Sequence, residues 1–144
     1  SRGRISLATP DPMAPPRIAA NYLSHPDDLP ALLSGLKIAR RILQAPGLSK
    51  SIRQETLPGQ GVTTDDALEA DIRARAETIY HPVGTCRMGS DATSVTDPQG
   101  RVRGVEGLRV VDASIMPQII AGNTNAPTMM IAENIARMMR GRPA

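Results

Sequence analysis

The apolar positions in the first third of the chain predict two short strands followed by a helix. Residues 4–9 and 18–23 each carry a short, imperfectly alternating run, and several prolines lie between the two runs. After His25, apolar residues recur at helical spacing up to Leu43, and a Pro-Gly pair at 46–47 follows where such a helix would end. We therefore expect a pair of strands that leads into one amphipathic helix.

A second amphipathic helix is expected after a loop that covers residues 54–61. Thr63 and Asp66 have the spacing of a helix start, in which side-chain oxygens accept from free backbone N–H groups. The buried face of this helix is predicted to consist of apolar residues at helical spacing: Leu68, Ile72, Ala76 and Ile79.

The next stretch, residues 80–89, has neither helical nor strand periodicity and predicts a loop of the kind that carries function. A type I turn at 97–100 and a second turn at 104–107 are expected to bring the chain into a strand at 108–111. Two adjacent valines in that strand favour burial on both faces, as in a parallel sheet. Ligands of such sheets gather at the carboxyl ends of the strands.

The chain closes with a helix predicted to begin at Pro127 and to be ended by Gly141, since proline suits the first helical turn and glycine the position after the last. Its expected buried face consists of Ile131, Ile135 and Met138. Its methionines are expected to provide adaptable core packing: Met129, Met130, Met138 and Met139. Arginines at its end are placed to offset the negative pole of the helix dipole: Arg137, Arg140 and Arg142.

Composition narrows the classes of function. The formal net charge of +3 is modest, and many of the 17 basic residues alternate with acidic ones, which is typical of a solvated surface and disfavours a nucleic-acid-binding domain. Tyr22 and Tyr80 are the only aromatic residues, so base-stacking platforms are missing and the core must be aliphatic. The single cysteine, Cys86, excludes an internal disulfide and a multi-cysteine metal site, and we expect no metal centre.

No apolar run reaches the roughly 18 residues that a membrane span requires, and no signal peptide is visible. The chain starts at Ser1, without an initiator methionine, and its first residues read like the middle of a longer polypeptide. We expect an upstream part to be missing and the location to be cytoplasmic.

His81 is the first candidate for chemistry. A histidine suits proton transfer because the pKa of its free side chain lies near neutrality. Its loop also carries Gly84 and Gly89, which permit unusual backbone angles, and Arg87, which suits pairing with a carboxylate or a phosphate. The alternative is a structural histidine held by hydrogen bonds.

The second candidate is the segment 122–128 at the start of the last helix. One interpretation is simple helix capping by an asparagine or threonine side chain. The other is that the helix directs its free N–H groups and the positive end of its dipole at a ligand oxygen that gains negative charge. The two interpretations are compatible.

Three motifs follow one another along the chain: YHPVGTCRMG at 80–89, GLRVVDAS at 107–114 and NTNAPT at 123–128. Together, and in this order, they resemble the C-terminal signature of the glucose-methanol-choline (GMC) oxidoreductases. The segments SRGRI at 1–5 and NYL at 21–23 resemble the choline-dehydrogenase-like branch of the same family. The resemblance therefore covers nearly the whole chain.

The resemblance implies FAD-dependent oxidation of a small-molecule alcohol to an aldehyde or ketone. It assigns His81 as the active-site histidine and Asn125 as its partner, at a position that is asparagine or histidine among members. A base must take the hydroxyl proton as hydride leaves the carbon, and an amide can hold the same oxygen. The family pattern also places residues against the flavin: Asp112, Ala113, Asn125, Ala126, Pro127 and Thr128.

The fold class that follows is α/β with α+β character. Residues 1–79 are expected to be part of an antiparallel-sheet substrate domain with helices, residues 80–105 an active-site loop and hairpin, and residues 106–144 the last strand and helix of an FAD-binding Rossmann-like domain. The Gly-x-Gly-x-x-Gly motif that cradles the FAD pyrophosphate is absent, so the N-terminal FAD-binding part of the same protein is the expected partner. The alternative function is a noncatalytic remnant or interaction module of the same fold.

Overall fold

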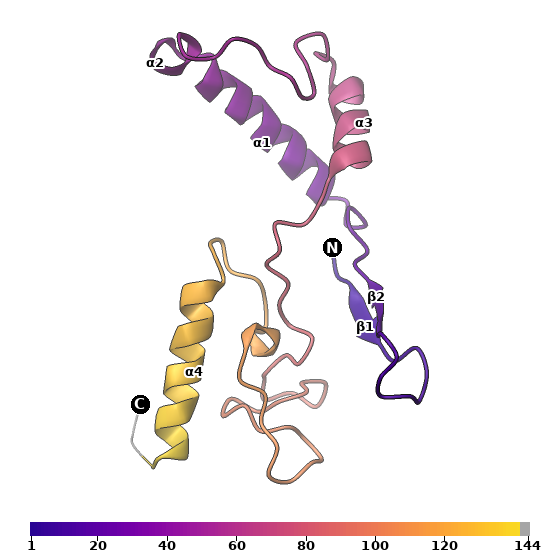
Figure 1. Cartoon of the computed structure of the whole chain (residues 1–144), viewed down its shortest axis with the longest axis vertical. Coiled ribbons are helices and arrows are strands. Elements are labelled where there is room, and N and C mark those ends of the chain that lie inside the picture. The colour runs from indigo at the N-terminus through magenta and orange to yellow at the C-terminus, as the bar shows by residue number, and fades with distance from the viewer. Residues whose placement is uncertain (142–144) are drawn as a thin grey trace. The chain divides into compact units, whose positions relative to one another are not determined.

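The computed structural model describes residues 1–141, which form two compact units, Ser1–Glu77 and the residues from Thr78 onward (Figure 1). Arg142, one of the arginines expected at the helix end, lies outside the described residues. Helices and one small antiparallel sheet give the α/β character that the sequence predicts. The division into 1–79, 80–105 and 106–144 as parts of larger domains stays a prediction.

The first unit opens with strands β1 (Arg4–Ser6) and β2 (Arg17–Ala19), which pair antiparallel with Ile5 opposite Ile18. Both strands are shorter than predicted. β2 stops because Asn21 and Leu23 have φ angles of 57° and 56°, which a strand does not tolerate. β1 ends at Ser6 because the three residues of β2 pair only with Arg4–Ser6.

Helix α1 (Asp28–Leu43) begins and ends where its apolar spacing predicts. It packs against α3 (Asp65–Arg75), and the small core of this unit lies between them: Leu29, Leu33 and Leu68. The Pro-Gly pair at 46–47 does follow the end of α1. However, Pro46 also begins a four-residue helix that was not predicted, α2 (Pro46–Ser49), in which proline occupies the first turn.

Helix α3 differs from its prediction at both ends. Its N-cap is Thr64, whose hydroxyl accepts a hydrogen bond from the Ala67 N–H at 3.3 Å, in place of a capping box between Thr63 and Asp66. The helix ends at Arg75, so the expected inclusion of Ala76 and Ile79 in its buried face is wrong, and Ile79 is 76% exposed.

The backbone leaves helical geometry at Ala76, whose φ and ψ are −58° and 126°, and a local hydrogen bond follows it. The Tyr80 N–H donates to the Thr78 hydroxyl at 2.9 Å. Such side-chain-to-backbone bonds compete with continuation of a helix.

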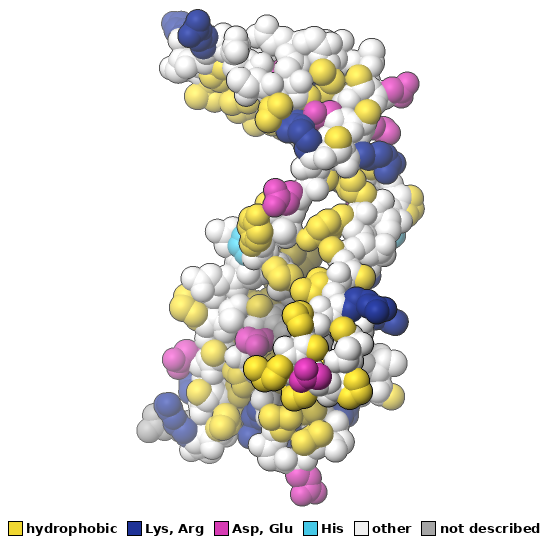
Figure 2. Space-filling model, turned by 45° about the vertical axis from the view of Figure 1, so that its right-hand side comes forward, with side chains coloured by type: hydrophobic (Ala, Val, Ile, Leu, Met, Phe, Trp, Pro, Cys, Tyr) yellow, Lys and Arg dark blue, Asp and Glu magenta, His cyan; other side chains and the backbone are white. Residues whose placement is uncertain are grey.

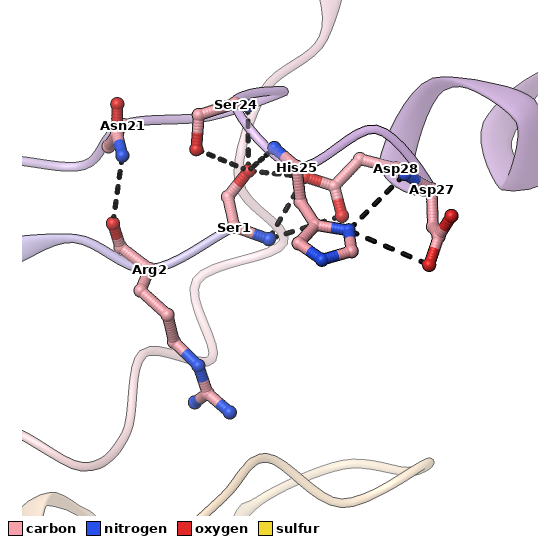
Figure 3. Close-up of polar contacts among 7 residues, drawn as sticks. All are labelled: Ser1, Arg2, Asn21, Ser24, His25, Asp27 and Asp28. Atoms are coloured by element: carbon pink, nitrogen blue, oxygen red, sulfur yellow. Dashed lines mark hydrogen bonds and ion pairs between the residues drawn. The ribbon is translucent and has the colours of Figure 1, made fainter.

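The start of the first unit is joined to the start of α1 by polar contacts around Ser1 (Figure 3). The Ser1 hydroxyl accepts from the N–H of Ser24 at 2.8 Å and of His25 at 3.2 Å, and it donates to the Asp28 carboxylate. His25 also accepts from the Asp28 N–H at its carbonyl and from the Asp27 N–H at Nδ1, both at 3.2 Å. His25 is thus a helix-entry residue.

The second unit consists of the 80–89 loop, a hairpin, a short 3-10 turn η1 (Ala113–Ile115) and helix α4 (Asn125–Met139). The hairpin is the segment whose isolated bridges pair Thr96 with Val102 and Arg101 with Arg109. Its core combines Ile115 and Met116 with Ile135 of α4. Gly100, at the hairpin turn, has φ of 73°, and a Cβ there would lie 2.8 Å from the Val110 carbonyl oxygen and 3.0 Å from Ile135 Cδ1. Glycine therefore lets the hairpin lie directly on α4.

The expected strand at 108–111 is wrong for this chain. Pairing is limited to single bridges, among them Arg101 with Arg109, and to hydrogen bonds such as that from the Val110 N–H to the Gly100 carbonyl at 2.9 Å. A parallel strand needs a parallel neighbour to accept its hydrogen bonds, and the described residues supply none for this segment.

Helix α4 begins two residues before the predicted start at Pro127. Proline is tolerated there because the first N–H groups of a helix have no partner within it. Gly141, with φ of 69°, ends the helix as predicted, and its N–H donates to the Met138 carbonyl at 3.0 Å. The expected core packing of the methionines is wrong for three of them, which are more than half exposed: Met129, Met130 and Met139.

Large apolar side chains lie on the surface of both units, visible in yellow in Figure 2. None of the helices among residues 1–141 is both long and apolar enough to cross a membrane. The cytoplasmic location stays a prediction.

We expect Ile115→Ala to destabilise the protein by about 2–5 kcal/mol, because Ile115 is 0% exposed and the truncated side chain leaves a cavity. Ile119→Ala is the matched control, since Ile119 is 57% exposed and its loss should change stability by less than about 0.5 kcal/mol. Thermal unfolding of the two variants measures the difference, and equal midpoints would contradict the assigned core.

Candidate active site

His81 lies on the 80–89 loop with its ring half-buried. Its Nδ1 atom is fully buried, and among the described residues no hydrogen-bond partner reaches it. The residue before it, Tyr80, has φ of 62°, a conformation that few non-glycine residues adopt. The alternative of a structural histidine held by hydrogen bonds is therefore not supported at Nδ1.

The loop that carries His81 is attached on one side to η1. The Cys86 N–H donates to the Ser114 carbonyl at 2.9 Å, and the Met88 N–H donates to the Ile115 carbonyl at 2.8 Å. Gly84 has φ of 87°, and a Cβ at this position would lie 3.3 Å from the Met116 carbonyl oxygen. The loop thus runs directly along the backbone of 114–116.

On its other side, the loop is attached to the first arm of the hairpin through Thr96, which is 0% exposed. The Thr96 hydroxyl donates to the Cys86 carbonyl at 3.2 Å. Its backbone carbonyl accepts from the Gly89 N–H at 3.0 Å. The 86–89 half of the loop is consequently held between η1 and the hairpin.

Arg87 pairs with a carboxylate of its own loop region. Its two terminal nitrogens donate to the two carboxylate oxygens of Asp91, each at 2.9 Å, and one of them also donates to the Thr93 hydroxyl at 2.7 Å. The pKa of the Asp91 carboxyl lies well below its ordinary value, mainly because of the hydrogen bonds from Arg87 and secondly because of the hydrogen bond from the Thr93 hydroxyl. The sequence predicted that Arg87 pairs with a carboxylate or a phosphate, and in the structure it pairs with the carboxylate of Asp91.

Asp112, expected beside the flavin, caps η1. Its Oδ1 atom accepts from the Ser114 N–H at 2.8 Å and from the Ser114 hydroxyl. Because the Ser114 carbonyl in turn accepts from Cys86, these bonds connect Asp112 and Ala113 with the His81 loop.

The start of α4 carries the other expected site residues. Thr124 is the N-cap, but no side-chain hydrogen bond caps the helix, so the expected capping by asparagine or threonine is wrong. The Thr128 N–H and hydroxyl both donate to the Thr124 carbonyl, at 3.0 and 2.6 Å. Pro127 has no N–H, which leaves the N–H groups of Asn125 and Ala126 as the first-turn donors without a partner inside the helix.

All of the predicted site residues thus lie in the second unit. The His81 loop is bonded to η1, Asp112 caps η1, and η1 contacts α4. That His81 and Asn125 bind the same substrate oxygen stays a prediction. Within residues 1–141, no group of three or more His, Cys, Asp or Glu side chains is placed to hold a metal ion.

Residues that sequence reasoning missed hold the loop from the hairpin: Ser94, Thr96 and Arg103. A serine or threonine in a loop and an arginine in a turn give no periodic signal, and most of their partners are backbone carbonyls. No pattern in this sequence would have identified them.

Comparison with known proteins identifies the family. The model for the C-terminal part of the GMC oxidoreductases, described as GMC oxidoreductase, matches residues 1–132. The chain belongs to the GMC oxidoreductase family, as the three motifs predict.

Two curated relatives are especially similar. An alcohol dehydrogenase (acceptor) from Pseudomonas putida is 58% identical over 139 residues, which cover 96% of this chain and 25% of the relative. An oxygen-dependent choline dehydrogenase from Paraburkholderia xenovorans (strain LB400) is 49% identical over 144 residues, which cover 100% of this chain and 26% of the relative.

Among solved structures, an FAD-dependent oxidoreductase from Chaetomium thermophilum matches with a TM-score of 0.88 and 27% identity, covering 99% of this chain and 26% of that one. The chain therefore spans about a quarter of the length of the proteins it matches.

Proposed function

We propose that this chain supplies the proton-accepting part of the active site in an FAD-dependent alcohol oxidoreductase. The observation that carries the proposal is His81, whose buried Nδ1 has no partner among the described residues although its loop is bonded on two sides. Because Nδ1 is buried, a substrate hydroxyl would have to approach the other ring nitrogen, Nε2, and we propose that atom as the proton acceptor.

The chemistry of the two side chains is complementary. His81 takes the proton from the substrate hydroxyl onto its imidazole ring as the carbon–hydrogen bond breaks. The Asn125 amide donates a hydrogen bond to the same oxygen and holds the reacting carbon in place while negative charge develops on the oxygen. Both roles need groups from separate elements, the 80–89 loop and the start of α4.

The start of α4 fits one contact with FAD. The first-turn N–H groups of Asn125 and Ala126 and the positive helix end suit an acceptor atom or a developing negative charge. By the family pattern, Asp112 and Ala113 would lie against the same group. FAD, bound by the complete protein, supplies the acceptor for the hydride that leaves the alcohol carbon.

We expect the isolated 144-residue chain to lose flavin readily, because the Gly-x-Gly-x-x-Gly motif for the pyrophosphate is not in it. Flavin absorbance after gel filtration measures this. Stoichiometric FAD that stays bound to the purified chain would contradict the assignment of the main FAD site to another part of the protein.

The test of the proposed function uses the complete protein, purified with FAD and mixed anaerobically with small alcohols, including choline. Bleaching of the oxidised flavin absorbance by one of them, with the matching aldehyde or ketone as product, is the expected result. A flavin that no alcohol reduces, or a complete protein that binds no flavin, would favour the noncatalytic module instead.

A further inference from the structure

The hairpin beside the His81 loop carries an arginine, Arg103, whose side chain reaches back to the end of that loop. We propose that Arg103 is a positioning residue, which acts together with Thr96 to hold the loop in the place where His81 can take the substrate proton. This inference rests on the proposed function, since it assigns Arg103 a role in that same proton transfer.

The contacts of Arg103 converge on one point of the loop. One of its terminal nitrogens donates to the Gly89 carbonyl at 2.7 Å, and its Nε donates to the Ser94 hydroxyl at 3.1 Å. The single hydrogen of the buried Ser94 hydroxyl is shared between the Asp91 carbonyl, at 2.6 Å, and the same Gly89 carbonyl, at 3.0 Å. The guanidinium therefore binds the last residue of the loop directly, and through Ser94 it also contacts the turn that follows the loop.

The backbone of the hairpin reinforces this attachment. The Arg103 N–H donates to the Val95 carbonyl at 3.0 Å, and the Val95 N–H donates to the Arg87 carbonyl at 3.0 Å. Thr96, next along the chain, binds both Cys86 and Gly89. Arg103 thus closes a set of bonds around residues 86–89, at the opposite end of the loop from His81.

This attachment bears on His81, whose ring is not held at Nδ1, through the loop backbone, in which the Arg87 N–H donates to the Gly84 carbonyl at 3.2 Å. The placement of His81 must come from the backbone of its loop, and that backbone is bonded to the hairpin and to η1 at 86–89. A general base misplaced by about 1 Å can lose up to about a hundredfold in rate. Loss of one attachment point should therefore reduce proton transfer without emptying the cofactor site.

In the complete enzyme, we expect Arg103→Ala to lower the limiting rate of flavin reduction by about tenfold, with FAD content and apparent alcohol affinity nearly unchanged. Arg103→Lys keeps a donor for the Gly89 carbonyl and should recover part of the rate. The matched control is Arg101→Ala, because Arg101 is an exposed arginine of the same hairpin that pairs with Asp97 at 3.3 Å and makes no hydrogen bond to the 80–89 loop. Its flavin reduction should match that of the unmodified enzyme.

A double-mutant cycle decides whether Arg103 acts through His81. If it does, Arg103→Ala slows reduction in the normal enzyme but has no further effect in His81→Ala, where no base remains to be positioned. The same tenfold loss in both backgrounds, or no loss in either, would overturn the positioning role. Normal flavin reduction by His81→Ala alone would instead overturn the proposed function, so the two failures are distinguishable.

Discussion

In the complete enzyme, His81→Ala should slow flavin reduction by alcohol by about two to four orders of magnitude, which is the usual contribution of a general acid–base group. The FAD content should barely change, because the role proposed for His81 concerns the substrate proton and not the binding of the cofactor. Anaerobic stopped-flow mixing, with the oxidised flavin absorbance as the signal, measures both the rate and the bound flavin.

His25→Ala provides the matched control. The chain has 2 histidines, and His25 lies at the entry to α1 in the other unit, where its Nδ1 accepts from the Asp27 N–H. Its removal should leave flavin reduction unchanged. If His81→Ala retained FAD and reduced it at the normal rate, another group would have to be the base.

The three longer helices, α1, α3 and α4, were predictable because their buried faces follow apolar spacing in the sequence, whereas the four-residue α2 was not. Leu29, Leu33 and Leu68 recur at helical intervals and form the contact between α1 and α3. The same spacing failed at Ile79, because the backbone leaves helical geometry at Ala76, three residues earlier. Apolar spacing identifies the buried face of a helix but not the residue at which the helix ends.

The strand expected at 108–111 shows a second limit. Adjacent valines indicate a preference for burial in a sheet, but a strand forms only when a neighbour accepts its hydrogen bonds. The chain spans about a quarter of the length of its relatives, and among its described residues this segment has only isolated bridges. The sequence therefore indicated a preference for strand structure at 108–111, but the described residues provide no neighbouring strand with which it could pair.

Only some residues of the candidate site could be predicted from the sequence. His81 and Asn125 could be proposed as site residues because they stand in motifs in the family's order. Thr96 and Arg103 could not, since each binds main-chain carbonyls, and any residue type can offer a carbonyl. Only the folded chain shows which carbonyl lies within reach.

Asn125→Ala in the complete enzyme should lower the rate of flavin reduction by about a hundredfold, which is typical for the loss of one donor to an oxygen that gains negative charge. Asn125→His, the other side chain that the resemblance leads us to expect at this position, retains an N–H donor and should lose less. The same stopped-flow measurement compares the two variants.

The position of Asn125 separates this catalytic effect from an effect on folding. Asn125 is exposed in the first turn of α4, and Thr124, not Asn125, is the N-cap. Alanine is a better helix former than asparagine, so the thermal midpoint of Asn125→Ala should be unchanged or higher. Asn123→Ala, at an exposed position just before the helix, controls for loss of an amide from this segment and should reduce flavin at the normal rate. A fall in rate that comes with a lower midpoint, or an equal fall in Asn123→Ala, would assign Asn125 a structural role and leave the substrate oxygen to His81 alone.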